Sequence, residues 1–309
     1  MLKVKAMMTL IRLPNLVFIF LTQVFAWYAL ILPVVKDSRF GEPVLSNGML
    51  ILLAFSTVII AAAGYMINDY FDIGIDLINK PERVTIEKIF KRRTVIVWHI
   101  LLNILALLMA GYIAYHSIRL RYLGIQLFSI LLLLFYSTTF KRKLIIGNLV
   151  IAVLTALSLL TVAAYEPMFP IFQISLYSIK IYWLYVLFAF LVTFCREVVK
   201  DIEDIKGDDA RQCKTIPLVW GIQAAKNFVY GLIVVLLLLL FSISFTQYES
   251  GYRVIFVMSS LALALIFVSH KVRQATHTFH FHSISTYLKW ITLAGILSML
   301  CFTDIINTH

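Results

Sequence analysis

Nine long apolar runs, separated by short polar segments, dominate this sequence. Each is about 20 residues long, which is the length an α-helix needs to cross the roughly 30 Å hydrocarbon core of a bilayer. Backbone amides and carbonyls in lipid must be satisfied within their own segment, so helices rather than strands are expected. The chain is 61% hydrophobic and only 14% charged, and no soluble domain is visible. The runs lie near residues 14–35, 47–68, 94–115, 120–138, 146–165, 179–199, 222–246, 252–269 and 286–303.

We therefore predict an all-α, polytopic membrane protein whose helices form a bundle. No linker rich in glycine and serine divides the chain, so residues 1–309 are interpreted as one domain. The longest inner loops cover residues 77–93 and 209–221. Functional residues concentrate on loops held by a rigid scaffold, so these two segments are expected to cap a site.

The basic residues favour one orientation. If the N-terminus lies inside, all but six of the 27 lysines and arginines fall in inner segments. Such residues are retained on the cytoplasmic side, which predicts a cytoplasmic N-terminus and an external C-terminus in a cell or inner membrane. The net charge of +11 lies mostly beside lipid. Anionic headgroups and a phosphorylated substrate are therefore better partners than nucleic acid, and no protein partner is implied. The six outer residues are Lys36, Arg39, Arg119, Arg121, Lys180 and Arg253.

Two acidic motifs with the same spacing stand at the inner ends of the second and sixth runs. On a helix, offsets of 0, 3 and 7 residues fall within roughly 60° of one another, so each motif directs three carboxylates to one side. Acids at membrane depth are costly unless cations neutralise them. Mg²⁺ prefers oxygen ligands and commonly joins carboxylates to a substrate's phosphates, which predicts a Mg²⁺-diphosphate site at a membrane surface. The motifs are Asp69, Asp72 and Asp76, then Asp201, Asp204 and Asp208.

Basic residues flank both motifs, as binding of an anionic diphosphate requires. Any one of them could be no more than a positive-inside anchor. The candidates for diphosphate binding are Arg12, Arg83, Lys141, Arg142 and Lys214.

The motifs and their surroundings resemble the UbiA-type intramembrane prenyltransferase superfamily. Asn68 precedes the first motif, as in that family. The segments Arg12-Leu13-Pro14-Asn15, Tyr136-Ser137, Gly147-Asn148 and Lys214-Thr215-Ile216-Pro217 also match its usual elements. The resemblance implies nine helices around a cavity that receives a prenyl tail. It further implies ionisation of an allylic diphosphate and capture of the cation by a lipid-soluble acceptor.

The resemblance also assigns roles. Asp72 and Asp204 would be essential to catalysis, because they belong to the two metal-binding motifs. The implied Mg²⁺ ligands are Asn68, Asp69, Asp72, Asp76, Asp201, Asp204 and Asp208.

The sequence around the second motif is similar to the branch that prenylates geranylgeranylglyceryl phosphate. Lys200 suits an anionic acceptor, and we assign Tyr136 to the acceptor as well. Glu197 lies two helical turns before Asp204 and would either accept the acceptor's proton or hold a neighbouring cation. After Arg83, the chain departs from the proline and Ser-Gly turn of that branch.

Two other functions are consistent with parts of the pattern. One is prenylation of an aromatic acid in quinone biosynthesis, which would require a ring-sized acceptor pocket. The other is a cation-coupled transporter, whose acids would line a path through the membrane. The clustering of the acids at one face disfavours the transporter.

Overall fold

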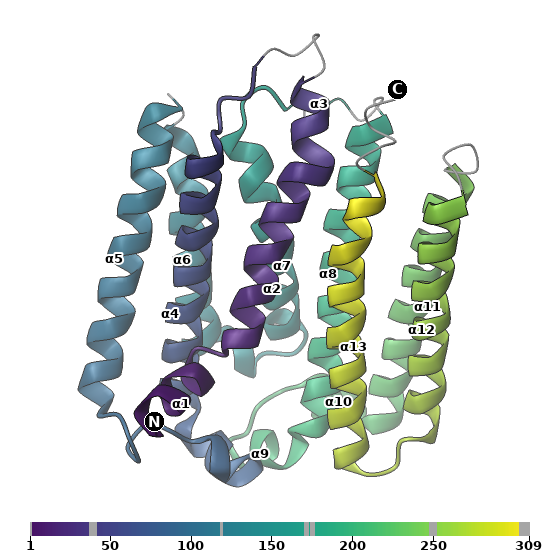
Figure 1. Cartoon of the computed structure of the whole chain (residues 1–309). Helices are drawn as coiled ribbons and strands as arrows, with labels where there is room; N and C mark the ends of the chain where they lie inside the picture. The colour runs from purple at the N-terminus through teal and green to yellow at the C-terminus, as the bar shows by residue number, and fades with distance from the viewer. Residues whose placement is uncertain are drawn as a thin grey trace.

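Long helices run side by side in a bundle, and three short helices gather at one end of it (Figure 1). The computed structural model describes residues 2–36, 42–117, 120–169, 173, 177–246 and 252–302. The short helices are α1 (Leu2–Leu10), α9 (Ile205–Ala210) and α10 (Ile216–Trp220). The end that carries them is called the α9 end below.

Nine helical spans in the described ranges are long and apolar enough to cross a membrane, which confirms the predicted fold class. The first is continuous from α2 (Leu13–Phe25) through a π-helical segment (Ala26–Ile31) to α3 (Leu32–Lys36). The others are α4 (Asn47–Asn79), α5 (Arg92–His116), α6 (Leu123–Thr138), α7 (Ile146–Tyr165), α8 (Tyr177–Glu203), α11 (Ile222–Thr246), α12 (Tyr252–Gln274) and α13 (Thr278–Ser298). Short 3₁₀ turns cover Pro81–Arg83, Leu120–Tyr122, Phe140–Arg142 and Met299–Phe302.

Helix α4 extends eleven residues beyond the predicted end of its span at residue 68, because it ends at Asn79. An apolar run locates only the part of a helix that lies in lipid, whereas the helix itself continues until a stop signal. Pro81 supplies that signal, since the residue before a proline disfavours helical geometry. The first acidic motif therefore lies within the last turns of a long helix.

Helix α8 lies at the centre of the larger hydrophobic core and packs against α7, α11 and α13. Val192, Cys195 and Val199 on this helix are fully buried. The helix stops at Glu203, and α9 begins at Ile205 after a turn at Asp204. The second acidic motif therefore spans a helix break, and the prediction of a single helical face was wrong in this detail.

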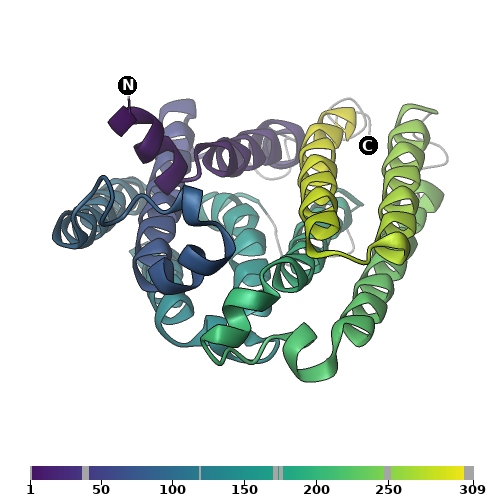
Figure 2. The ribbon, with the colours of Figure 1, turned by 90° about the horizontal axis from the view of Figure 1, so that it is seen from below.

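Helix α13 begins at Thr278, well before the predicted start of the ninth span at residue 286. The first turns of this helix contain polar residues, so a pattern of apolar residues alone does not reveal where the helix begins. A capping box between His277 and His280 fixes its start. Lys289 thus lies eleven residues inside the helix, which runs beside α2 and α8 in both views (Figure 2).

Candidate active site

A cavity of about 610 Å³ opens at the α9 end of the bundle. Its walls come from segments far apart in the chain, namely α1, α2, α4, α6, α7, α8, α9 and α13. Its volume lies within the range of sites that hold small molecules and cofactors. All six aspartates of the two motifs line it. The long helices therefore bring together motifs that are about 130 residues apart in sequence.

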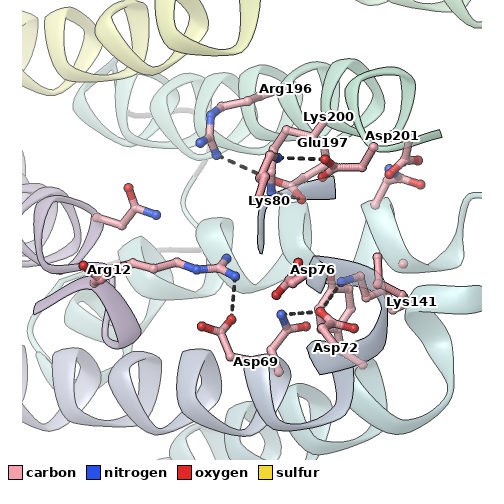
Figure 3. A pocket seen from close by; sticks show the side chains of 18 of the residues that line it. Arg12, Asp69, Asp72, Asp76, Lys80, Lys141, Arg196, Glu197, Lys200 and Asp201 are labelled. Atoms are coloured by element: carbon pink, nitrogen blue, oxygen red, sulfur yellow. Dashed lines mark hydrogen bonds and ion pairs between the residues drawn. The ribbon is translucent and has the colours of Figure 1, made fainter. Parts of the chain in front are cut away.

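The first motif forms the α4 wall of this cavity (Figure 3). Asp72 is 4% exposed; it accepts a hydrogen bond from Asn68 Nδ2 at 2.7 Å and forms an ion pair with Lys141. Asp69 pairs with Arg12, whose Nη2 lies 2.9 Å from its Oδ1. The carboxylate of Asp76 has no hydrogen-bond or ion-pair partner among the described residues. Arg12 and Lys141, which come from two other segments, thus neutralise part of the negative charge of the first motif.

The second motif forms the opposite wall. Asn148 Nδ2 donates to Asp201 Oδ2 at 2.7 Å, and Lys80 Nζ lies 2.7 Å from Asp204 Oδ1. Burial raises the pKa of Asp208 to about 6, and repulsion from Asp204 adds to this rise. Carboxylates that lie this close together favour the binding of further cations.

One side chain joins the two walls. Asn79 Nδ2 donates to the Asp204 carbonyl at 3.0 Å, and the Gly207 amide donates to Asn79 Oδ1 at 2.9 Å. A Cβ on Gly207 would lie only 2.4 Å from Asn79 Nδ2, so this contact requires glycine. The end of α4 therefore fixes the helix break that carries the second motif.

Arg12 reaches the cavity from the turn between α1 and α2. Its backbone is left-handed, with φ 53° and ψ 52°, a conformation uncommon for residues other than glycine. Its guanidinium lies 4.9 Å from the centre of the Tyr65 ring, and Asn15 Nδ2 is 3.4 Å from the Tyr65 hydroxyl. The motif that begins with Arg12 is thus folded against α4.

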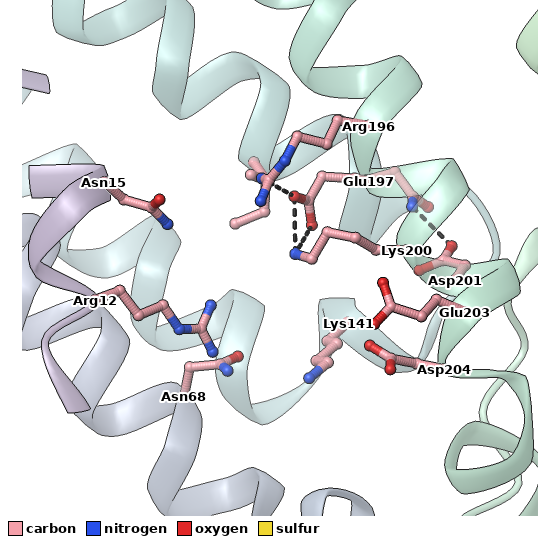
Figure 4. A network of polar contacts seen from close by, with 12 residues as sticks. Arg12, Asn15, Asn68, Lys141, Arg196, Glu197, Lys200, Asp201, Glu203 and Asp204 are labelled. Atoms are coloured by element: carbon pink, nitrogen blue, oxygen red, sulfur yellow. Dashed lines mark hydrogen bonds and ion pairs between the residues drawn. The ribbon is translucent and has the colours of Figure 1, made fainter. Parts of the chain in front are cut away.

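A second group of charges lies deeper on α8 (Figure 4). Lys200 Nζ is 2.9 Å from both oxygens of Glu197, which is buried, and Arg196 Nη1 is 3.4 Å from Glu197 Oε1. These side chains face the first motif across the cavity (Figure 3). Glu197 is therefore already engaged by Lys200 through both of its oxygens.

The oxygen-rich lining fits hard divalent cations. Within the described residues, no three His, Cys, Asp or Glu side chains are close enough to hold a metal ion. Instead, Arg12, Lys141 and Lys80 each pair with one aspartate. Asn68 Oδ1 is buried and lacks a hydrogen-bond partner, which leaves an oxygen donor free beside Asp72. An oxygen-only set of this kind suits Mg²⁺.

The structure separates the predicted site residues into two groups. Arg12, Asn68, Tyr136, Lys141, Glu197, Lys200 and the six aspartates all line the cavity. Arg142 and Lys214 are exposed and do not; the Lys214 amide donates to the Arg142 carbonyl at 2.9 Å. The side chain of Arg83 lies outside the described part of the structure.

Sequence reasoning gave no role to several residues that line the cavity or join its walls. Asn79 lies three residues after the first motif, so its position was the available signal, whereas Lys80 is one of the basic residues that the sequence already singles out beside that motif. Arg196 adjoins Glu197. Lys289 is separated from both motifs in sequence, and its only signal was a charge within an apolar segment.

Residues 38–301 match the model of the UbiA prenyltransferase family. The chain belongs to this family. It is therefore a prenyltransferase and an integral membrane protein, as the resemblance implied.

Curated relatives in this family share one name, digeranylgeranylglyceryl phosphate synthase. The chain is 33% identical to the one from Sulfurisphaera tokodaii over 235 residues, which are 71% of this chain and 73% of the relative. It is 34% identical to the one from Methanosarcina mazei, with 72% of each chain covered. The match to the Thermococcus sibiricus protein is 36% identical but spans 57% of this chain and 58% of the relative.

Solved UbiA-type structures share the fold. A chain from a structural study of digeranylgeranylglyceryl phosphate synthase in membranes aligns with a TM-score of 0.65, covering 97% of this chain and 99% of that one at 24% identity. A UbiA homologue from Archaeoglobus fulgidus, bound to GPP and Mg²⁺, aligns with a TM-score of 0.62 over 95% and 99% of the two chains at 13% identity.

Proposed function

We propose that this UbiA-family enzyme transfers a geranylgeranyl group from its diphosphate to the hydroxyl of geranylgeranylglyceryl phosphate. One observation carries the proposal: six aspartates and a separate cationic group line a single cavity. The first feature suits a metal-bound diphosphate, and the second suits an acceptor that bears its own phosphate. The shared name of the curated relatives supports this choice.

The residues around the two motifs would hold the donor. Asn68 and the aspartates are placed to bind Mg²⁺, the ion found with GPP in the Archaeoglobus homologue. Bound Mg²⁺ supplies charge neutralisation of the diphosphate. Lys141 and Arg12 add positive charge from the α6–α7 connection and the α1–α2 turn. Their pKa values are raised by the neighbouring carboxylates despite burial, which keeps both side chains charged.

The reaction exchanges one carbon–oxygen bond for another. The bond between the allylic carbon and the diphosphate oxygen breaks, and the diphosphate keeps the electron pair. The acceptor's hydroxyl oxygen then bonds to that carbon, and its proton passes to a weak base such as water. Lys141 and Arg12 are placed to stabilise the leaving diphosphate, because positive groups fixed where charge develops lower the barrier.

Glu197 is placed to hold Lys200 toward the acceptor rather than to remove the proton. Both of its oxygens lie 2.9 Å from Lys200 Nζ, so neither is free. We assign Tyr136, which lines the same cavity, to the acceptor side as well.

We further propose that the α9 end faces the cytoplasm and that the chain acts as one unit. Most of the basic loop residues lie at the end that holds both motifs, in agreement with retention of positive charge on the cytoplasmic side. A cysteine at Lys91, labelled by a membrane-impermeant reagent only after cell lysis, would agree with this orientation. Labelling in intact cells would contradict it.

A competition assay tests the reaction. Purified protein in vesicles receives Mg²⁺, geranylgeranyl diphosphate, geranylgeranylglyceryl phosphate and a panel of aromatic acids, and mass spectrometry identifies the products. We expect the digeranylgeranyl product, and its loss when EDTA removes Mg²⁺. A prenylated aromatic acid as the only product would contradict the proposal.

A further inference from the structure

Three basic side chains that line the cavity lie on α8 and α13, outside the two acidic motifs. Arg196 and Lys200 come from α8, and Lys289 comes from α13. Arg196 precedes Asp201 by five residues, which corresponds to about 7.5 Å along a helix. The cationic group therefore begins beside the second motif, at Lys200, and extends away from it to Arg196 within the same cavity.

The charges of this group are not balanced. Among the described residues, Glu197 is the carboxylate that these cations contact, and both of its oxygens lie 2.9 Å from Lys200 Nζ. The contact from Arg196 to Glu197 is long, at 3.4 Å, and Arg196 Nε is buried without a hydrogen-bond partner. Within the group itself, three positive charges against one negative charge leave a surplus of two, and Asp201 of the second motif follows Lys200 directly.

Lys289 is the most unusual member. It lies eleven residues inside α13, where a charge is costly unless it serves a function. No carboxylate of the described residues lies within ion-pair distance of it; its Nζ lies 5.3 Å from the centre of the Phe18 ring, and Arg196 lines the same cavity. A second cation beside Lys289 makes its charge still more costly unless an anion binds between them.

We propose that Arg196, Lys200 and Lys289 form the binding site for the phosphate of the acceptor. A phosphate monoester carries about −1.5 to −2 charge at neutral pH, which matches the surplus of two. The unpaired Nε of Arg196 provides a donor for it. This inference rests on the proposed function and deepens it by assigning the residues that select a phosphorylated acceptor.

The position of the site explains how both substrates meet. The donor's diphosphate is expected at the aspartates, and the acceptor's phosphate would lie up to about one and a half helical turns away along α8. The glycerol hydroxyl, two carbons from its phosphate oxygen, would then lie between the two anions. Glu197 keeps Lys200 oriented between them.

The test compares two acceptors that differ only in the phosphate. Kinetic constants are measured for geranylgeranylglyceryl phosphate and for geranylgeranylglycerol, in vesicles with and without anionic lipid. In Lys289→Gln we expect the KM for the phosphorylated acceptor to rise about 10- to 100-fold, as expected for loss of a charged hydrogen bond. The KM for geranylgeranylglycerol should change far less, so the preference for the phosphorylated acceptor should fall.

Three further variants sharpen the comparison. Lys289→Arg should recover most of the preference for the phosphorylated acceptor, and Arg196→Gln should lose it as Lys289→Gln does. Lys271→Gln removes a lysine from α12 outside the cavity and should behave as wild type. An unchanged preference in both Lys289→Gln and Arg196→Gln would overturn the proposal, as would an effect only on the dependence on anionic lipid.

Failure of the proposed function would be seen separately. If wild type prenylates neither glycerol acceptor, the reaction assignment fails before any variant is compared. Binding of glycerol 1-phosphate, measured by calorimetry without turnover, still tests the site. Binding to wild type and its loss in Lys289→Gln would support the phosphate site, and equal binding to both proteins would overturn it.

Discussion

The amide of Gly207 donates a hydrogen bond to the side-chain oxygen of Asn79 at 2.9 Å. This contact joins the end of α4 to α9, and the same side chain also binds the Asp204 carbonyl. The two acidic motifs are therefore held in a fixed relation by a residue that belongs to neither motif.

Asn79→Ala should weaken metal-dependent activity without removing a metal ligand. The helix break at Asp204 would lose two hydrogen bonds, so we expect the Mg²⁺ concentration for half-maximal activity to rise about tenfold. Asn227→Ala, on the exposed face of α11, is the matched control. An unchanged Mg²⁺ requirement would argue against this positioning role.

Gly207→Ala should lower activity in the wild-type background and lower it much less in a protein that already carries Asn79→Ala. The three atoms nearest to the added Cβ all belong to the Asn79 side chain, and the alanine at 79 removes them. A double-mutant cycle on activity measures this coupling. Additive effects would show that the crowding arises elsewhere.

Asp72→Asn and Asp204→Asn should each reduce kcat by at least about 100-fold, since each removes a negative oxygen from the proposed metal site. Each variant keeps the size of the side chain, so folding should be retained. Asp209→Asn, an exposed neighbour of the second motif, should retain activity. Near-normal turnover in both aspartate variants would contradict the assignment of Asp72 and Asp204 to a metal site.

Lys141→Gln should raise the KM for the donor about tenfold or more, because Lys141 brings a charged amine to Asp72 inside the cavity. Lys143→Gln, two residues away and exposed, serves as the control. Steady-state kinetics with varied geranylgeranyl diphosphate give the comparison. Equal KM values for the two variants would count against a role for Lys141 in donor binding.

Glu166→Ala should lower stability while leaving the kinetic constants of the folded protein unchanged. Glu166 is 1% exposed at the end of the bundle opposite the cavity, where it accepts the Leu45 amide at 2.9 Å and the Met168 amide at 3.0 Å. Leaving these amides unpaired costs about 1–3 kcal/mol. Thermal unfolding in detergent checks this against Glu42→Ala, which is exposed.

The sequence predicted the features that depend on local pattern. Apolar length predicts nine spans, and the structure has nine within its described residues. The spacing of Asp69, Asp72 and Asp76 predicts a common face, and all three line one cavity. Their assignment as metal ligands stays a prediction.

Features that depend on packing could not be predicted in this way. The ends of α4 and α13 lie outside the apolar runs, because polar residues continue a helix after it leaves the apolar region. Nothing in the sequence pattern indicates that Lys289 lines the cavity together with Arg196, because the two residues come from different helices. The depth of Lys289 became visible only when the start of α13 was known.

The cavity lies at one end of the bundle, with its charged walls at that end and the long helices extending away from them. A lipid substrate can therefore present its polar head there while its hydrocarbon chain stays in the bilayer. Moving such a chain into water costs about 0.8 kcal/mol for each methylene group. An enzyme built in this way joins two insoluble molecules without dissolving either of them.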